Sequence, residues 1–326
     1  MRRRLRLVGA LVVAAVTTAG CQSGDSGAVP SGPVVVTVDA QDPGTTFDRR
    51  LLGTNLPAWV GPGRLADPAF RAGVVSSGTT VIRMPGGSWS DDYDWSACEN
   101  ETSDCPFLGS ARPSDFLGFL QATGLAGMWT VNVNETAQQA AALVAFFNGR
   151  TDDERPIGVD RNGVDWKTVG TWARLRASHG HAQPLPVALW EVGNETYGGK
   201  GDGDGDGDCA SFAWEHSWTC DGAAYVTGDS GHDGFVAIAA AMKAADPTIE
   251  VGAVGVADGA AWGRWGDEVV HGAAGSMDFY VVHQYAFDGR PSVSGALRQP
   301  SGAWERTLAA VRDTQRGSTP VPLAVT

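Results

Sequence analysis

The chain has 326 residues, enough for one large α/β domain or two smaller ones, and it is rich in Gly (44) and Trp (12). This composition favours many tight turns and an aromatic-lined cleft over a helical bundle. Its 24 Lys and Arg residues against 37 Asp and Glu residues give a net charge of −13, which repels nucleic acid and is compatible with a neutral partner such as a glycan.

The first 20 residues predict a secretory signal, because a run of arginines precedes an apolar stretch at 7–16 that is too short to span a membrane. The ending Thr18-Ala19-Gly20-Cys21 resembles a bacterial lipobox, although Leu usually stands in the place of Thr18. It implies a lipidated N-terminus at Cys21; the alternative is ordinary cleavage nearby, with Cys21 buried or lost. We therefore expect an exported protein, anchored to the cell membrane through the Gly-, Ser- and Pro-rich linker 21–33.

From residue 34 to 326, stretches typical of strands and helices alternate along the chain. Strands are expected at 34–38, 51–55, 79–84, 127–133, 186–192, 249–256, 277–285 and 321–326. Helices are expected at 68–77 after the cap Asp67, and at 115–122, 136–147, 165–178, 232–245 and 303–316, with a long loop at 198–231. This alternation predicts an α/β fold with a parallel sheet, whose strands we number one to seven from residue 51.

The buried strand expected at 186–192 runs directly into Gly193, Asn194 and Glu195. In an α/β barrel the loops that follow the strands carry the chemistry, because the packed interior cannot hydrate a charge. Glu195 is therefore a candidate proton donor. Glu191 lies inside the strand, so we expect it to be a structural acid with a partner.

Export favours local disulfides, Cys98 with Cys105 and Cys209 with Cys220, although four cysteines allow three pairings. A zinc site is the alternative, but neither pair has close metal-ligand spacing and no His cluster accompanies them. The run 201–208 alternates Gly and Asp and begins like a calcium loop, but the bidentate Glu that such a loop needs is out of register. A solvated acidic insert is the preferred interpretation, and calcium binding is the alternative.

Three strand ends carry motifs that occur together in one enzyme family. They are Arg83-Met84-Pro85-Gly86-Gly87-Ser88-Trp89 with Tyr93-Asp94-Trp95, then Asn194-Glu195, then His283-Gln284-Tyr285. With these motifs in this order, residues 51–326 resemble the α-L-arabinofuranosidases of glycoside hydrolase family 51 in the retaining (β/α)8 superfamily. The resemblance implies a (β/α)8 TIM barrel, incomplete because the chain stops at the seventh strand.

The resemblance also implies roles for individual residues. Glu195 would be the general acid/base, and Asn194 would donate to the sugar hydroxyl next to the anomeric carbon. Asn132 would be a pocket residue, and Tyr285 would position the nucleophile. Arg83 is expected to pair with the carboxylates rather than with the substrate.

Other residues near these motifs have less settled roles. Asn55 stands where the family usually has a Glu that contacts arabinose, which puts the sugar specificity in doubt. For His283, a hydrogen-bonded core residue and a catalytic residue are equally expected roles. Of the tryptophans that could stack on sugar rings, Trp89, Trp95 and Trp129, the last fits the core better because it lies mid-strand. Solvation of a turn is the preferred role of Asp91, Asp92 and Asp94.

Retaining hydrolysis requires a second carboxylate about 5 Å from the first, as nucleophile. The resemblance implies that it follows the seventh strand, so we expect it just beyond Thr326 and expect this chain to be an inactive fragment with an open barrel edge. No metal or organic cofactor is required by the mechanism. The expected function is an α-L-arabinofuranosidase that releases arabinose from polysaccharide. The alternatives are another glycosidase of the superfamily (xylosidase, glucuronidase or endoglucanase) and a non-catalytic glycan-binding lipoprotein.

Overall fold

The computed structural model of the chain describes residues 41, 44, 47–103, 105, 107–199, 215–287, 289–298 and 300–326. Its compact part is Arg49–Thr326, and the account below is confined to it. The expected signal, the linker with Cys21, the strand at 34–38, the acidic run 201–208 and Cys209 lie outside the described residues. Within the described ranges, no helix has the length and apolar character needed to cross a bilayer.

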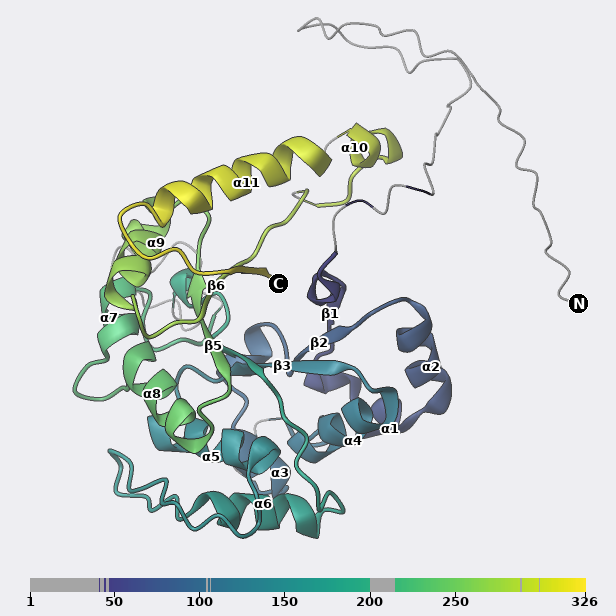
Figure 1. Cartoon of the computed structure of the whole chain (residues 1–326), viewed down its shortest axis with the longest axis vertical. Helices are drawn as coiled ribbons and strands as arrows, with labels where there is room; N and C mark the ends of the chain where they lie inside the picture. The colour runs from purple at the N-terminus through teal and green to yellow at the C-terminus, as the bar shows by residue number, and fades with distance from the viewer. Residues whose placement is uncertain are drawn as a thin grey trace, which may run out of the picture. The chain divides into compact units, whose positions relative to one another are not determined.

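Seven parallel strands form one sheet in which every strand pairs with the next along the chain (Figure 1). They are β1 Gly53–Asn55, β2 Val81–Met84, β3 Ala126–Val131, β4 Leu189–Val192, β5 Glu250–Gly255, β6 Phe279–Val282 and β7 Leu323–Val325. The predicted strands from residue 51 onward are thus confirmed, each trimmed at its ends to the residues that share a ladder. A parallel sheet in strict sequence order is what repeated strand–helix units produce.

The sheet is curled, as the side chains on its inner face show. Alternate residues of each strand point inward, and they form a small apolar cluster of their own, made by Val81, Met128, Phe279 and Val281 with Leu189 and Ala324 packed against it. These residues come from strands that are far apart in the sheet order, so the sheet bends round to bring them together. The fold is an incomplete (β/α)8 barrel with a packed interior.

One glycine makes room for this interior. A Cβ atom added at Gly252 of β5 would lie 2.1 Å from Cε2 of Phe279. Only glycine therefore lets the Phe279 ring lie flat across the neighbouring strand.

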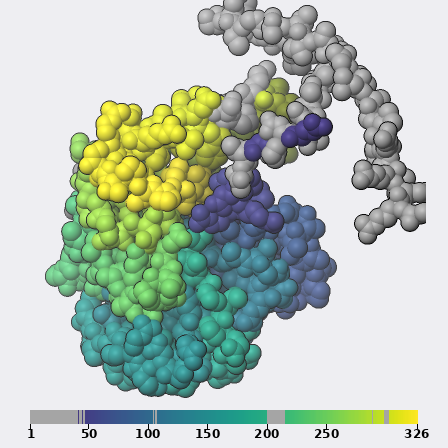
Figure 2. Space-filling model, in the orientation of Figure 1, coloured from purple at the N-terminus to yellow at the C-terminus, as the bar shows by residue number. Residues whose placement is uncertain are grey.

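Helices cover the outer face of the sheet, and successive chain segments, coloured purple to yellow, follow one another around the compact part (Figures 1 and 2). They are α1 Pro62–Ala66, α2 Pro68–Ser76, α3 Trp95–Glu99, α4 Pro113–Thr123, α5 Ala137–Asn148, α6 Val169–Ser178, α7 Gly222–Thr227, α8 Phe235–Ala245, α9 Ala261–Gly272, α10 Val293–Arg298 and α11 Pro300–Thr314. The outward-facing Trp129 and Trp190 both pack on Phe147 of α5, at 5.2 and 6.1 Å between ring centroids. Burying such large rings supplies about 2–3 kcal/mol each.

The helix ends follow the capping signals in the sequence. Asp67 caps α2 by accepting from the amide of Ala69, as predicted. The expected helix at 165–178 begins later, at Val169, with Thr168 as its cap. Residues Asp165 and Thr168 instead form isolated antiparallel bridges with Val159 and Pro156.

The loop expected at 198–231 contains the short helix α7, which Asp221 caps. Helix α9 was also missed, and its first turn is unusual. Trp262, Gly263 and Arg264 all have positive φ, at 53°, 65° and 70°. Two of these are not glycine, so the turn carries backbone strain.

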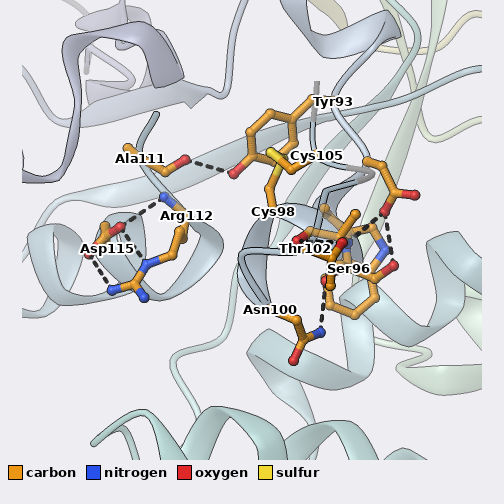
Figure 3. Close-up of a disulfide and its surroundings, with 12 residues drawn as sticks. Tyr93, Ser96, Cys98, Asn100, Thr102, Cys105, Ala111, Arg112 and Asp115 are labelled. Atoms are coloured by element: carbon orange, nitrogen blue, oxygen red, sulfur yellow. Dashed lines mark hydrogen bonds and ion pairs between the residues drawn. A yellow bond between two sulfur atoms is a disulfide. The ribbon is translucent and has the colours of Figure 1, made fainter. Parts of the chain in front are cut away.

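The disulfide between Cys98 and Cys105 is present, as predicted, with the Cα atoms 4.7 Å apart (Figure 3). It closes the loop that leaves α3, and both cysteines are buried. Next to it, the hydroxyl of Tyr93 donates to the carbonyl of Ala111 at 2.7 Å. The loop that follows the first motif is therefore fixed covalently and by a buried hydrogen bond.

Candidate active site

The turn after β4 places Glu195 at the carboxyl end of the sheet. Gly193 has φ 86°, and a Cβ atom there would lie 2.5 Å from Oγ1 of Thr196, so no other residue fits. Glu195 itself has φ 42° and ψ 34°, a left-handed conformation that is uncommon outside glycine. Such a conformation costs free energy and persists only where the surrounding structure holds it. Residues of this kind cluster at functional sites.

Two side chains that follow β6 contact the carboxylate of Glu195. Nδ1 of His283 lies 2.6 Å from its Oε1, and the hydroxyl of Tyr285 donates to the same oxygen at 3.4 Å. Glu195 is 8% exposed, whereas Tyr285 is 72% exposed. The structure thus brings together the second and third sequence motifs, with Tyr285 at the open side of the carboxylate.

Beneath Glu195 lies a buried ion pair between Arg83 and Glu191. Nε of Arg83 is 2.6 Å from Oε2 of Glu191, and the side chains are 5% and 0% exposed. Thr130 donates to the same carboxylate oxygen at 3.1 Å. Burial alone would raise the pKa of Glu191, but the charge and hydrogen bond of Arg83 and the nearby ring of His283 lower it to about 2. Glu191 is therefore ionised, and it has the partner that its position inside the strand predicted.

His283 joins this pair to Glu195. Its Nε2 lies 3.8 Å from Oε1 of Glu191, while its Nδ1 faces Glu195. Burial lowers the pKa of His283, but its contacts with the two carboxylates outweigh burial and raise the pKa to about 9. The ring is consequently an imidazolium at neutral pH, with each nitrogen directed at an acid.

Asn194 is held from three directions. Its Oδ1 accepts from Nη2 of Arg83 at 2.9 Å, and its Nδ2 donates to Oε2 of Glu215 at 3.3 Å. Its backbone amide donates to Oδ1 of Asp91 at 3.1 Å. The orientation of Asn194, and with it the turn that carries Glu195, depends on all of these partners.

Asp91 and Glu215 are the site residues that sequence reasoning missed. The predicted role of Asp91 in solvating a turn is wrong, because its side chain is 0% exposed and points at Asn194. Glu215 is 1% exposed, and in the sequence it stood out only as the out-of-register Glu of the calcium-loop alternative. The only hint in the sequence was that Asp91 stands two residues after Trp89 in the first motif.

The neighbours of Asp91 fit the prediction better. Asp94 caps α3 by accepting from the amides of Ser96 and Ala97. Asp92 pairs with the ring of His216.

Other predicted residues lie close to this group. Oδ1 of Asn55 accepts from Nη1 of Arg83 at 3.3 Å. Asn132 follows Val131, which pairs with Val192, so it stands at the level of Gly193, and it is 8% exposed.

Of the three tryptophans, Trp95 and Trp129 belong to the core. Trp89 is half-buried and stacks on Phe107, with centroids 4.0 Å apart. Trp129 is buried, as expected of a mid-strand residue, and Trp95 is buried against Trp166 and Trp172. Trp95 is thus a core residue, and the idea that it stacks on a sugar is wrong.

A cavity of about 650 Å³ opens away from Glu195, between α2 and the first two strands. Thr54, Phe70, Val74 and Ile82 are among its lining residues, and it shares Asn55 with the site. Asp67 lines it, but Asp91, Glu191, Glu195 and Glu215 do not.

At the other edge of the sheet, the amide of Thr326 donates to the carbonyl of Val282 at 3.3 Å. The end of β7 therefore lies beside the strand that leads into His283.

Comparisons with known proteins agree with the geometry. No family model matches the chain. An intracellular exo-α-(1→5)-L-arabinofuranosidase of Bifidobacterium longum is 24% identical over 230 residues, which cover 66% of this chain and 34% of that protein.

Among solved structures, a family 51 α-L-arabinofuranosidase from Bifidobacterium longum matches with a TM-score of 0.60 and 20% identity, over 85% of this chain and 54% of that one. An α-L-arabinofuranosidase from Thermotoga maritima, solved with arabinose, matches with a TM-score of 0.52 and 20% identity, over 73% and 44%. The chain thus spans about a third of the curated relative and about half of these structures. The sequence relative and both structures are α-L-arabinofuranosidases, and the structures share the fold of this chain.

Proposed function

We propose that this chain is the catalytic part of a retaining glycoside hydrolase, an α-L-arabinofuranosidase that releases arabinose from polysaccharide. The observation that carries the proposal is the placement of Glu195. It stands in a left-handed turn at the end of β4, 2.6 Å from His283 and below the exposed Tyr285. A carboxyl at the carboxyl end of a barrel strand, fixed by neighbours and open on one side, suits proton transfer to a glycosidic oxygen.

The roles follow from the contacts. His283 and Tyr285 bond to Oε1 of Glu195, and no described residue donates to Oε2. Oε2 would therefore deliver a proton to the leaving oxygen and later take one from water. The amide nitrogen of Asn194 uses one hydrogen on Glu215 and has a second for a sugar hydroxyl.

The nucleophile is proposed to be a carboxylate that follows Thr326 in the gene, about 5 Å from Glu195 as retaining hydrolysis requires. The position of Thr326 beside Val282, one residue before His283, supports this place. Reading the gene past codon 326 tests it: an Asp or Glu directly after this strand is expected, and an apolar or amide residue there would contradict the proposal.

The activity test uses the protein with its continuation beyond Thr326 and a panel of 4-nitrophenyl glycosides. Glu195→Gln is expected to reduce turnover by roughly 10²–10⁴-fold, whereas Glu305→Gln, an exposed residue on α11, is the matched control and should not. Unchanged turnover by the Glu195 variant would remove this residue from the acid/base role. Xyloside turnover equal to arabinofuranoside turnover would overturn the sugar assignment.

Export and lipid anchoring at Cys21 remain a separate proposal, supported by the basic and apolar leader and the residues before Cys21. Mass spectrometry of the mature N-terminus tests it. A diacylglyceryl group on Cys21 is expected, and a membrane-free protein whose N-terminus lies elsewhere would contradict it. Cys21→Ser is the matched variant, which should abolish membrane attachment.

A further inference from the structure

Two buried carboxyl groups, those of Asp91 and Glu215, both accept hydrogen bonds from Asn194 and interact with each other. Asp91 belongs to the segment after β2, and Glu215 to the segment after β4. Oδ2 of Asp91 is buried, and among the residues that the structure describes it has no hydrogen-bond partner. A proton between the two groups would satisfy this oxygen.

The surrounding contacts force the two segments together. Nδ2 of Asn134 donates to the carbonyl of Asp91 at 2.7 Å and to that of His216, the neighbour of Glu215, at 2.6 Å. The ring of His216 pairs with Asp92, next to Asp91. Two carboxyl groups thus approach because their flanking residues are bound to each other.

The charges around the pair oppose its full ionisation. Burial and the nearby charge of Glu215 raise the pKa of Asp91 well above its usual range, and burial also raises the pKa of Glu215. The other groups facing the pair are Asp92, Glu191 and Glu195, all acids, and Tyr197 near Glu215. Among the described residues near the pair, Arg83 is already bound to Glu191 and to Asn194, and the ring of His216 is paired with Asp92.

We propose that Asp91 and Glu215 share one proton and act as a clamp on Asn194, so that the order of the turn carrying Glu195 depends on that proton. The clamp itself is inferred from the contacts alone. Its effect on catalysis rests also on the proposed function. While the proton is held, Asp91 fixes the backbone amide of Asn194 and Glu215 fixes its side chain. Once the proton leaves, two like charges stand side by side in a buried place, and the pair separates.

The clamp makes Asp91 and Glu215 positioning residues, since neither reaches the reacting atoms. Its consequence is an alkaline limit on activity that belongs to this pair. Asp91→Asn supplies a permanent donor toward Glu215 while its carbonyl oxygen still accepts from Asn194, so it should lock the clamp at every pH. Glu215→Gln cannot accept from both Ser88 and Asn194 while donating to Asp91, so it should loosen the side chain of Asn194.

The test is NMR titration of the amide and carboxamide resonances of Asn194 in the chain as it stands, assigned by their loss in Asn194→Asp. In the unaltered protein they should titrate with a midpoint above the ordinary carboxyl range. The titration should vanish in Asp91→Asn, and in Glu215→Gln the carboxamide resonances should move toward those of a solvated Asn. Glu305→Gln is the control and should reproduce the unaltered curve.

Resonances of Asn194 that do not titrate, or that titrate identically in both variants, would overturn the clamp whether or not the protein hydrolyses glycosides. The titration of the unaltered chain decides this even if a variant fails to fold. In an active protein, Asp91→Asn should also move the alkaline limb of kcat upward by roughly one pH unit or more, with KM little changed. An unmoved limb would overturn the catalytic consequence alone.

Discussion

The imidazole Nδ1 of His283 lies 2.6 Å from Oε1 of Glu195, which joins the end of β6 to the end of β4. Because Nε2 of the same ring faces Glu191, one cation serves two acids at the mouth of the barrel. The stability of this arrangement should depend on the protonation of the ring.

The first prediction concerns pH. The pKa of His283 is raised from 6.5 to about 9 in the folded protein. Its contribution to folding is therefore fully present below pH 6.5 and is lost as the pH rises through 9. The difference in unfolding free energy between the unaltered chain and His283→Asn should fall by about 3 kcal/mol across this window. Urea denaturation at several pH values measures it. His271→Asn, at an exposed site, is the control, and a pH-independent difference for His283→Asn would contradict the imidazolium.

The second prediction concerns the buried ion pair. Arg83→Met leaves Glu191 charged in a place without water, which should cost about 3–5 kcal/mol of unfolding free energy. Arg83→Met combined with Glu191→Leu should recover much of this loss, because both charges are removed together. Chemical denaturation compares the variants. Arg150→Met breaks an exposed pair with Asp152 and should leave stability unchanged, so an equally harmless Arg83→Met would refute the burial argument.

The third prediction concerns the barrel interior. Gly252→Ala places a methyl group against the ring of Phe279 and should destabilise the chain by about 1–3 kcal/mol. Gly63→Ala is the matched control: it lies in α1 with open space around it, and it should be neutral or stabilising by about 0.4–1 kcal/mol. Thermal unfolding followed by circular dichroism separates them. Equal melting temperatures for the two variants would contradict the close packing of β5 on β6.

The fourth prediction concerns the disulfide. Replacing Cys98 and Cys105 with Ala opens a short loop and should lower the unfolding free energy by roughly 2 kcal/mol through the greater entropy of the unfolded chain. The melting temperature should fall accordingly. Adding a reductant to the unaltered chain should reproduce at least this fall. A variant as stable as the oxidised chain would show that the hydrogen bond of Tyr93 alone fixes the loop.

Local patterns in the sequence were enough to predict the sheet. The apolar run before Gly193 is too short for a helix and is bounded by Pro186 and Gly193. Both the strand and the turn that follows it could therefore be predicted. The capping residue Asp67 likewise predicted where α2 begins. The motifs also brought Arg83, Glu195, His283 and Tyr285 to one end of the sheet, because parallel strands end on the same side.

What the sequence did not reveal depends on contacts between distant segments. Asp91 looked like a turn residue, and only the approach of the segment holding Glu215 makes it a buried acid. Trp95 looked available for a sugar, yet α5 and α6 close over it. Residues 165–168 contain no Gly or Pro, and it is the antiparallel bridges of Asp165 and Thr168 that hold them out of the helix.

The backbone of Glu195 has a further consequence. At φ 42° and ψ 34° this residue occupies a conformation that glycine adopts without steric cost and that a longer side chain resists. Folding and chemistry therefore favour different amino acids at the same point. Glycine at position 195 would relieve this strain, but it would remove the contact with His283 and the proton donor on which the proposed hydrolysis depends.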